Sequence, residues 1–391
     1  MTNFLAVERA LRAAAPHALI EAARSALATH YGAHAVELLV ADYSLATLHP
    51  VTAVPRTAEG LSVHTTVAGR AFCSQVPCQE DAGPGMVVLH LPVSVRGDRF
   101  GILSVSLPAE LATPETRNDL AEIAGLLGHE VLVAQRDTDI YLQARRVSRL
   151  TLAAEMQWQL LPARACSRAE YSIGAQLEPA YAIHGDNFDW ASTAENLTLT
   201  ITNGMGEGIQ AALLTNLAVN ALRNARRAGV GIADQAALAD QALYAAHRGE
   251  AYVSTLLLSF ELATGRVQVV DAGSPHLWRQ RDKVVERIPF EAQFPLGMFD
   301  QSEYALQEFR VLPGDRLVFV SDGVYAASSP GGEPYEEHAL ARAIASAGLL
   351  PAADVPAAVL RALGDYRDRD ADDDALVVCL DWHGRGALST A

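Results

Sequence analysis

The stretch from Glu178 to Gly208 constrains the fold of this chain most, because it joins acidic residues, a strand and a glycine-rich turn. Apolar side chains alternate with threonines from Leu197 to Thr202, which is the pattern of a half-buried strand. The sequence N-G-M-G-E-G follows, and its three glycines in five residues allow positive φ angles and close backbone approach. A buried helix is expected from Ile209 to Ala228. A strand, a glycine turn and a helix in this order present backbone carbonyls and acids at a sheet edge.

Acidic residues also mark the ends of other predicted strands. Asp186 and Asp189 lie in a short glycine-containing segment, Asp322 follows the apolar run 317–321, and Asp372 and Asp373 precede the strand 375–380. Any one of these acids is explained by a turn, where Asp is common. Their recurrence at strand ends, with little lysine nearby, predicts a hard-cation site with oxygen ligands.

Composition excludes several classes of function. The chain has 391 residues, enough for two or three domains, and a formal charge of −16. Lys283 is the only lysine. This acidity argues against a nucleic-acid partner and against an anionic membrane surface. Four scattered cysteines, no apolar run of the ~18 residues that span a bilayer and no signal peptide predict a soluble cytoplasmic protein.

Residues 1–135 are predicted to form one α/β domain. Helical spacing over 4–30 is followed by strand patterns, and Arg96-Gly97-Asp98-Arg99 separates two apolar runs, as in a β-hairpin. Thr113-Pro114 begins a further helix. The order of elements and the segment L-P-V-S-V-R-G-D-R-F-G-I-L-S-V resemble a GAF domain, which implies a sensor of small molecules. A dimerisation domain without a ligand is the alternative.

Residues 136–162 are predicted to be a helical linker, since no glycine or proline interrupts the pattern before Pro162. A coiled coil or a plain spacer both fit its irregular heptads. The apolar stripe over 114–161 predicts a homodimer. The end of the linker, Q-W-Q-L-L-P, is strongly apolar and is expected to pack on the domain that follows.

Residues 163–385 are predicted to form the second domain. Many strands, two long helices early and two more late suggest two sheets flanked by helices, an αββα sandwich. The fold class of the whole chain is therefore α/β (α+β).

This second domain resembles the SpoIIE-like branch of metal-dependent Ser/Thr phosphatases with the type-2C fold. The segments that carry the resemblance come in the family's order: Q-W-Q-L-L-P, E-P-A-Y-A-I-H-G-D-N-F-D-W, N-G-M-G-E-G, D-A-G-S-P-H-L, P-L-G-M, L-P-G-D-R-L, V-S-D-G-V and D-D-D-A-L-V-V. A GAF domain ahead of such a phosphatase is a usual arrangement in that family.

The resemblance implies a site for two Mn or Mg ions that activate a water for attack on a phosphoserine or phosphothreonine. It makes Asp186 and Asp322 the catalytic residues and metal ligands. Gly204 would offer its carbonyl to the ion held by Asp186. Asp372 would hold the other ion together with Asp322, and Asp373 is the alternative to Asp372.

Asn203 falls on the family's bridging aspartate and is the main departure from the pattern. An asparagine has one neutral carbonyl oxygen and an NH2 group that cannot bind a metal, so metal affinity should fall. Four other positions deviate from the usual residue of the family: His184, Asn187, Ser274 and Ala326.

Three functions follow from these observations. The first is a sensor-regulated protein-serine/threonine phosphatase that acts, by resemblance, on a phosphorylated STAS-type anti-sigma-factor antagonist. The second, favoured by Asn203, is a pseudophosphatase that binds a phosphoprotein without turnover. A hydrolase of small phosphate esters ranks below both because it needs a basic pocket.

Overall fold

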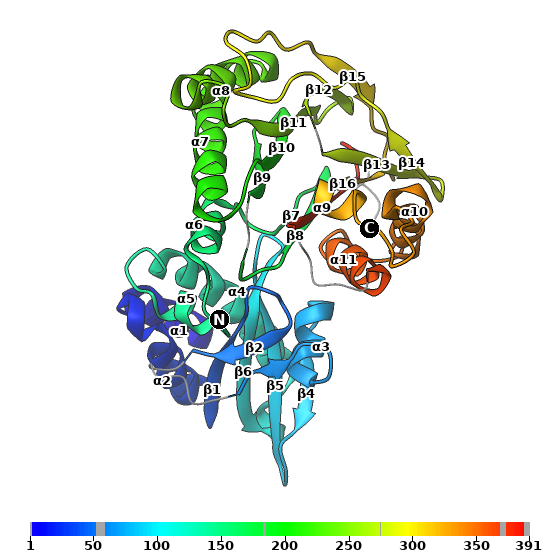
Figure 1. Ribbon diagram of the computed structural model, residues 1–391. Coiled ribbons are helices and arrows are strands. Elements are labelled where there is room, and N and C mark those ends of the chain that lie inside the picture. The colour runs from blue at the N-terminus through cyan, green and yellow to red at the C-terminus, as the bar shows by residue number, and fades with distance from the viewer. Residues whose placement is uncertain (1, 52–58, 183–184, 274, 368–372, 387–391) are drawn as a thin grey trace. The chain divides into compact units, whose positions relative to one another are not determined.

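The computed structural model describes residues 2–51, 59–182, 185–273, 275–367 and 373–386 (Figure 1). Contacts between residues divide the chain into two compact units, Met1–Arg149 and Leu150–Ala391. None of the helices in these ranges is long and apolar enough to cross a bilayer.

The first unit is a six-stranded antiparallel sheet in the order β3-β2-β1-β6-β5-β4. Its strands are β1 Ala35–Ala41, β2 Thr47–Pro50, β3 Leu61–Ser62, β4 Cys78–Asp81, β5 Met86–Val95 and β6 Asp98–Pro108. Its helices are α1 Thr2–Ala13, α2 Leu19–Tyr31, α3 Val67–Ser74, α4 Pro114–Ala134 and α5 Ile140–Ala144. Helices α1, α2 and α4 form a core with one face of the sheet, and α3 packs on the other face (Figure 1).

Local sequence signals in this unit are confirmed where they depend on turn and cap chemistry. The β5–β6 hairpin turns at Arg96 and Gly97, whose φ angles of 53° and 94° suit a tight two-residue turn. The Thr113 hydroxyl accepts a hydrogen bond from the Thr116 N–H, and Pro114 occupies the first turn of α4.

The linker predicted as one helix over 136–162 is divided in the structure. Helix α5 ends at Ala144, and α6 begins at Leu152. The Thr151 side chain caps α6 by accepting a hydrogen bond from the Ala154 N–H, so a new helix begins here instead of the old one continuing. The apolar stripe of α4 packs against its own sheet. That part of the stripe is therefore covered within one chain.

The second unit contains two antiparallel sheets. One has the order β15-β12-β11-β10-β9, and the other has the order β14-β13-β16-β17-β8-β7. The strands are β7 Ala165–Ser167, β8 Tyr171–Glu178, β9 Asp186–Ser192, β10 Asn196–Gly204, β11 Val253–Glu261, β12 Arg266–Ala272, β13 His276–Arg281, β14 Val284–Ile288, β15 Gln307–Arg310, β16 Arg316–Val320 and β17 Ala375–Trp382.

Helices cover the outer face of each sheet, so the αββα prediction is confirmed. The helices are α6 Leu152–Leu160, α7 Gly208–Arg227, α8 Ile232–His247, α9 Asp322–Tyr325, α10 Tyr335–Ser346 and α11 Val355–Tyr366. Helices α7 and α8 form a core with β11 and β12, and α10 and α11 form a second core with β13, β16 and β17 (Figure 1). Alternate residues of the strands point between the sheets, where the rings of Phe260 and Trp382 stack 6.0 Å apart.

The segment around Asp186 and Asp189, which the sequence analysis describes only as glycine-containing, is strand β9. Strand β9 pairs antiparallel with β10, and this register places Asp186 opposite Asn203 and Asp189 opposite Thr200. Asp186 and Asp189 are buried because β9 pairs with β10. The short local sequence pattern did not show this pairing. The edge at which β9 begins and β10 ends is where the candidate site lies.

Candidate active site

Strands β9 and β10 bring Asp186 and Asn203 side by side at the edge of the first sheet. Asp186 is almost fully buried, with an exposed fraction of 2%. Asp189 lies three residues further along the same strand and therefore on its other face. There it forms ion pairs with Arg223 at 2.8 Å and Arg226 at 2.9 Å, both from α7. Asp189 thus fixes α7 to β9, while Asp186 belongs to the site.

The end of β16 brings the second predicted acid to the same place. Asp322 begins α9 directly after the strand, and Asn203 donates a hydrogen bond from Nδ2 to its Oδ1 at 2.5 Å. This bond joins the two sheets of the sandwich. Asn203 therefore acts toward Asp322 as a donor, which a carboxylate at this position could do only when protonated.

The start of β17 brings acids from the far end of the chain. The Asp374 Oδ2 accepts hydrogen bonds from the backbone N–H groups of Gly185 at 2.8 Å and Asp186 at 3.2 Å. Asp374 is 1% exposed. Asp373 lies beside it, and its Oδ1 accepts a hydrogen bond from the Asp374 N–H. Asp372, the preferred ligand from this triplet in the sequence interpretation, lies outside the described residues.

Glycines at three points permit this close approach. A Cβ at Gly185 would lie 2.3 Å from the Gly204 carbonyl oxygen, and one at Gly204 would lie 2.2 Å from the Thr215 hydroxyl. A Cβ at Gly323 would lie 1.8 Å from the Asp374 carbonyl oxygen. At Gly185 and Gly323 these contacts exclude any larger residue without movement of the backbone, and at Gly204 without movement of the Thr215 side chain. The glycines next to Asp186, Asn203 and Asp322 are thus requirements of the site's geometry.

The electrostatics of the site show that its carboxylates are crowded. Burial raises the pKa of Asp186 well above its usual value, and the negative charges of Asp374, Asp322 and Asp373 raise it further. Burial, followed by the charge of Asp373, also raises the pKa of Asp322, although the hydrogen bond from Asn203 opposes this. Carboxylates that repel one another in a desolvated site are stabilised when a cation lies between them.

The residues present fit a divalent cation in part. The Asp186 Oδ2 is buried and has no hydrogen-bond partner among the described residues, so an oxygen ligand is available there. Carboxylates and backbone carbonyls are the ligands that Mg and Mn prefer. Within the ranges that the structure describes, however, no set of three His, Cys, Asp or Glu side chains is arranged to hold one ion. Among the described residues, the unpaired Asp186 Oδ2 is the oxygen that supports a ligand role.

Of the predicted site residues, Asp186, Asn203, Gly204, Asp322 and Asp373 meet at this edge. Asp374, which the sequence interpretation did not assign, belongs to the same cluster, and its burial at the start of a strand was the missed signal. Among the departures from the family pattern, Asn187 donates a hydrogen bond to Gln157 of α6 at 3.1 Å, and Ala326 follows the last residue of α9. His184 and Ser274 lie outside the described residues.

The linker's apolar end also packs near this edge. Trp158 of α6 donates a hydrogen bond from its indole N–H to the Ala180 carbonyl at 2.7 Å, and the Arg164 guanidinium lies 4.1 Å from the centre of its ring. Leu160 is buried. The prediction that this end packs on the second domain is thus in agreement with the structure, because α6 belongs to the same unit as the site.

Comparison with known proteins gives one family match. Residues 193–383 match the family model of stage II sporulation protein E, SpoIIE. A search of curated proteins found no match.

Among solved structures, the RsbU and RsbW domains of a Mycobacterium tuberculosis protein are 20% identical, with a TM-score of 0.49 over 55% of this chain and 60% of that one. SpoIIE of Bacillus subtilis, solved as its PP2C phosphatase domain with a fragment of its regulatory domain, is 15% identical, with a TM-score of 0.48 over 89% of this chain and 82% of that one. The catalytic domain of the serine/threonine phosphatase PstP, in complex with two manganese ions, is 17% identical, with a TM-score of 0.39 over 54% of this chain and 98% of that one. The family match thus identifies residues 193–383, just under half of the chain, as a region similar to SpoIIE.

Proposed function

We propose that this chain is a metal-dependent protein-serine/threonine phosphatase. The observation that carries the proposal is the convergence of Asp186, Asp322, Asp373 and Asp374 at one edge of the sandwich, where a buried oxygen of Asp186 has no hydrogen-bond partner among the described residues. Bound Mn or Mg would supply Lewis-acid chemistry for hydrolysis of the phosphate ester.

The protein's own groups prepare the site in three ways. Asp186 and Asp322 concentrate negative charge where cations would bind, and in that role they are the catalytic candidates. Gly185 has no side chain, so the Gly204 carbonyl oxygen can approach it closely. Asp374 orients the strand start, because it accepts hydrogen bonds from the backbone of Gly185 and Asp186.

The test is the hydrolysis of p-nitrophenyl phosphate and of a phosphoserine peptide at rising Mn concentration. Asp186→Asn and Asp322→Asn should each reduce turnover by at least about a hundredfold, because each removes an anionic oxygen ligand of the catalytic ions. Asp189→Asn is the matched control, since Asp189 is an acid of the same strand that points away from the site. Circular dichroism must show that this variant is folded, because it also loses the ion pairs with Arg223 and Arg226. Turnover that persists in both site variants would contradict the proposal.

A second candidate function is a pseudophosphatase that binds a phosphoprotein without hydrolysis. The observation that favours it is the hydrogen bond from Asn203 to Asp322, because Asn203 there engages a ligand oxygen instead of providing one. Binding of a phosphoserine peptide without turnover at any Mn concentration would establish this function.

The finer assignments rest on the family resemblance. We infer that the substrate is a phosphorylated STAS-type antagonist of an anti-sigma factor, in a cytoplasmic regulatory pathway. We also infer that Met1–Arg149 is a GAF-like sensor. A homodimer is inferred separately, from the apolar helical stripe over 114–161. The helical coverage of both sheet faces in this unit supports the GAF-like assignment.

A further inference from the structure

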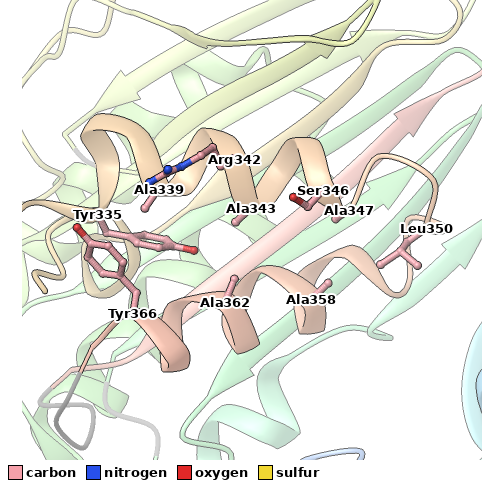
Figure 2. Close-up of a pocket in the computed structure, with 10 residues that line it drawn as sticks. All are labelled: Tyr335, Ala339, Arg342, Ala343, Ser346, Ala347, Leu350, Ala358, Ala362 and Tyr366. Atoms are coloured by element: carbon pink, nitrogen blue, oxygen red, sulfur yellow. The ribbon is translucent and has the colours of Figure 1, made fainter.

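A groove between α10 and α11 lies on the outer face of the second sheet, where the phosphatase proposal gives it no role (Figure 2). Its volume is about 320 Å³, at the lower end of the range for small-molecule pockets. Five alanines line its walls. Ala339 and Ala343 belong to α10, Ala347 directly follows α10, and Ala358 and Ala362 belong to α11. Larger side chains at these positions would fill the space between the two helices.

A buried polar atom points into this groove. The Tyr335 side chain is 1% exposed, and its hydroxyl has no hydrogen-bond partner among the described residues. Figure 2 shows that the hydroxyl is directed between the helices. The neighbouring Tyr366 points elsewhere, because its hydroxyl donates to the Glu333 carbonyl at 3.0 Å. An unpaired buried hydroxyl is costly, so a ligand that accepts its hydrogen bond would stabilise the site.

The hydroxyl can act as a donor at any physiological pH. Burial raises the pKa of Tyr335 to about 12, against a smaller opposing effect of the charge of Arg367. The group therefore remains protonated, and its natural partner is an acceptor such as a carboxylate oxygen.

The two ends of the groove differ in polarity. Arg342 lines the end near Tyr335, and its guanidinium is directed toward that end in Figure 2. It forms no ion pair or hydrogen bond within the described part of the chain. At the other end, Leu350 lines the groove and Leu349 is fully exposed. From Ala339 to Ala347 the helix rises by about 12 Å, at about 1.5 Å per residue.

We propose that this groove binds a linear hydrocarbon chain that carries a carboxylate. The carboxylate lies between the Tyr335 hydroxyl and the Arg342 guanidinium, and the hydrocarbon chain runs along the alanines toward Leu350. A slender chain fits because five of the lining residues are alanines, with Ser346 adding one small hydroxyl beside Ala347. An anionic head group fits because the polar end supplies a neutral and a cationic donor.

Calorimetric titration of the full chain with octanoate tests the proposal. Ala343→Leu and Ala362→Leu, which fill the groove from opposite walls, should each weaken binding at least about tenfold, since overpacking leaves no room for the ligand. Tyr335→Phe keeps the ring but removes the donor, and it should weaken binding about three- to tenfold. Arg342→Gln should weaken it to a similar extent.

Ala345→Leu is the matched control, because Ala345 lies on the exposed side of α10 and should leave the affinity unchanged. Circular dichroism of each variant shows whether it is folded. Absence of octanoate binding up to about 10 mM, or binding that both groove-filling variants leave unchanged, would overturn the proposal. If octanol binds as tightly as octanoate and Arg342→Gln has no effect, the carboxylate assignment is wrong. These measurements use no phosphatase assay, so they are independent of the proposed activity.

Discussion

Replacement of Asn203 by aspartate tests the central feature of the candidate site. In the metal-free protein the change removes the donor that holds Asp322 Oδ1 at 2.5 Å and places a carboxylate oxygen in its position. Two full charges about 4 Å apart repel by about 4 kcal/mol at an effective dielectric constant of about 20. Asp186 and Asp373 add to this repulsion, because their charges already act on one another in this site.

The cost has an upper limit, because one carboxyl can take up a proton instead. Holding an aspartate protonated at pH 7, against an ordinary pKa of about 3.9, costs about 1.36 × (7 − 3.9), or roughly 4 kcal/mol. We therefore expect Asn203→Asp to lower metal-free stability by about 2–4 kcal/mol. For a unit of this size the melting temperature falls by about 2–4 °C per kcal/mol, so the decrease should be about 4–16 °C.

Manganese should reverse the effect. The added carboxylate supplies an anionic ligand near Asp186 and Asp322, so Mn should bind the variant more tightly than the wild type and raise turnover. An ion at about a hundred times its Kd adds about 2.7 kcal/mol of stability, which would recover most of the loss. The assay combines melting curves in EDTA and in Mn with hydrolysis of p-nitrophenyl phosphate.

Asn203→Ala is the matched control, since it removes the hydrogen bond without adding charge. It should lose only about 1.5–3 kcal/mol and gain nothing from Mn. An unchanged metal-free melting temperature in Asn203→Asp would refute the electrostatic reasoning. Turnover equal to that of the wild type would show that Asn203 is no defect, and the pseudophosphatase function would lose its main support.

Two further predictions concern stability. Burial raises the pKa of Asp271 to about 6. The ionised carboxylate therefore lowers the free energy of unfolding, and this loss of stability is absent below pH 4. It grows between pH 4 and pH 6 and reaches about 3 kcal/mol at higher pH. Asp271→Asn should therefore melt at a higher temperature than the wild type at pH 7.5 and equally at pH 4; equal melting at both values would contradict this. Gly323→Ala should lower the free energy of unfolding by about 1–3 kcal/mol, because the added Cβ would collide with the Asp374 carbonyl. Gly364→Ala is the control, because Gly364 is a helical position with open space around it. It should be neutral or stabilising in the same calorimetric melts.

Local chemistry in the sequence predicted the elements whose signals lie within a few residues. The Arg96-Gly97 turn, the Thr113 cap and the strand before N-G-M-G-E-G are all present where their residue types require them. The break between α5 and α6 was missed because helical spacing continues through residues 145–151, while the Thr151 cap starts a second helix. The predicted stripe over 114–134 is real, but its partner is the sheet of its own unit.

The sequence predicted which residue types form the candidate site, but it did not predict which residues contact one another there. The sequence predicted that Asp186 and Asp322 lie close together, because acids at strand ends can meet at one sheet edge. It did not predict that Asp186 faces the site while Asp189 faces α7. These orientations depend on the register of β9 with β10. Asp186 faces the second sheet, and Asp189 faces Arg223 and Arg226 of α7. Likewise, Asp374 is separated from Gly185 by most of the domain's sequence, so no local pattern could show that its carboxylate holds the start of β9.

The hydrogen bond between Asn203 and Asp322 changes what the substitution of the usual aspartate means. From sequence, Asn203 is a missing ligand whose neutral side chain also relieves repulsion among the clustered carboxylates. In the structure it also donates a hydrogen bond to Asp322, which stabilises the ionised carboxylate and connects β10 to the start of α9. Without metal, an aspartate there would add to the repulsion that already raises the pKa of Asp186 and Asp322. We therefore expect the asparagine to lower the affinity for cations and to raise the stability of the metal-free state. The response of the site to Mn then distinguishes the two candidate functions, which share one fold.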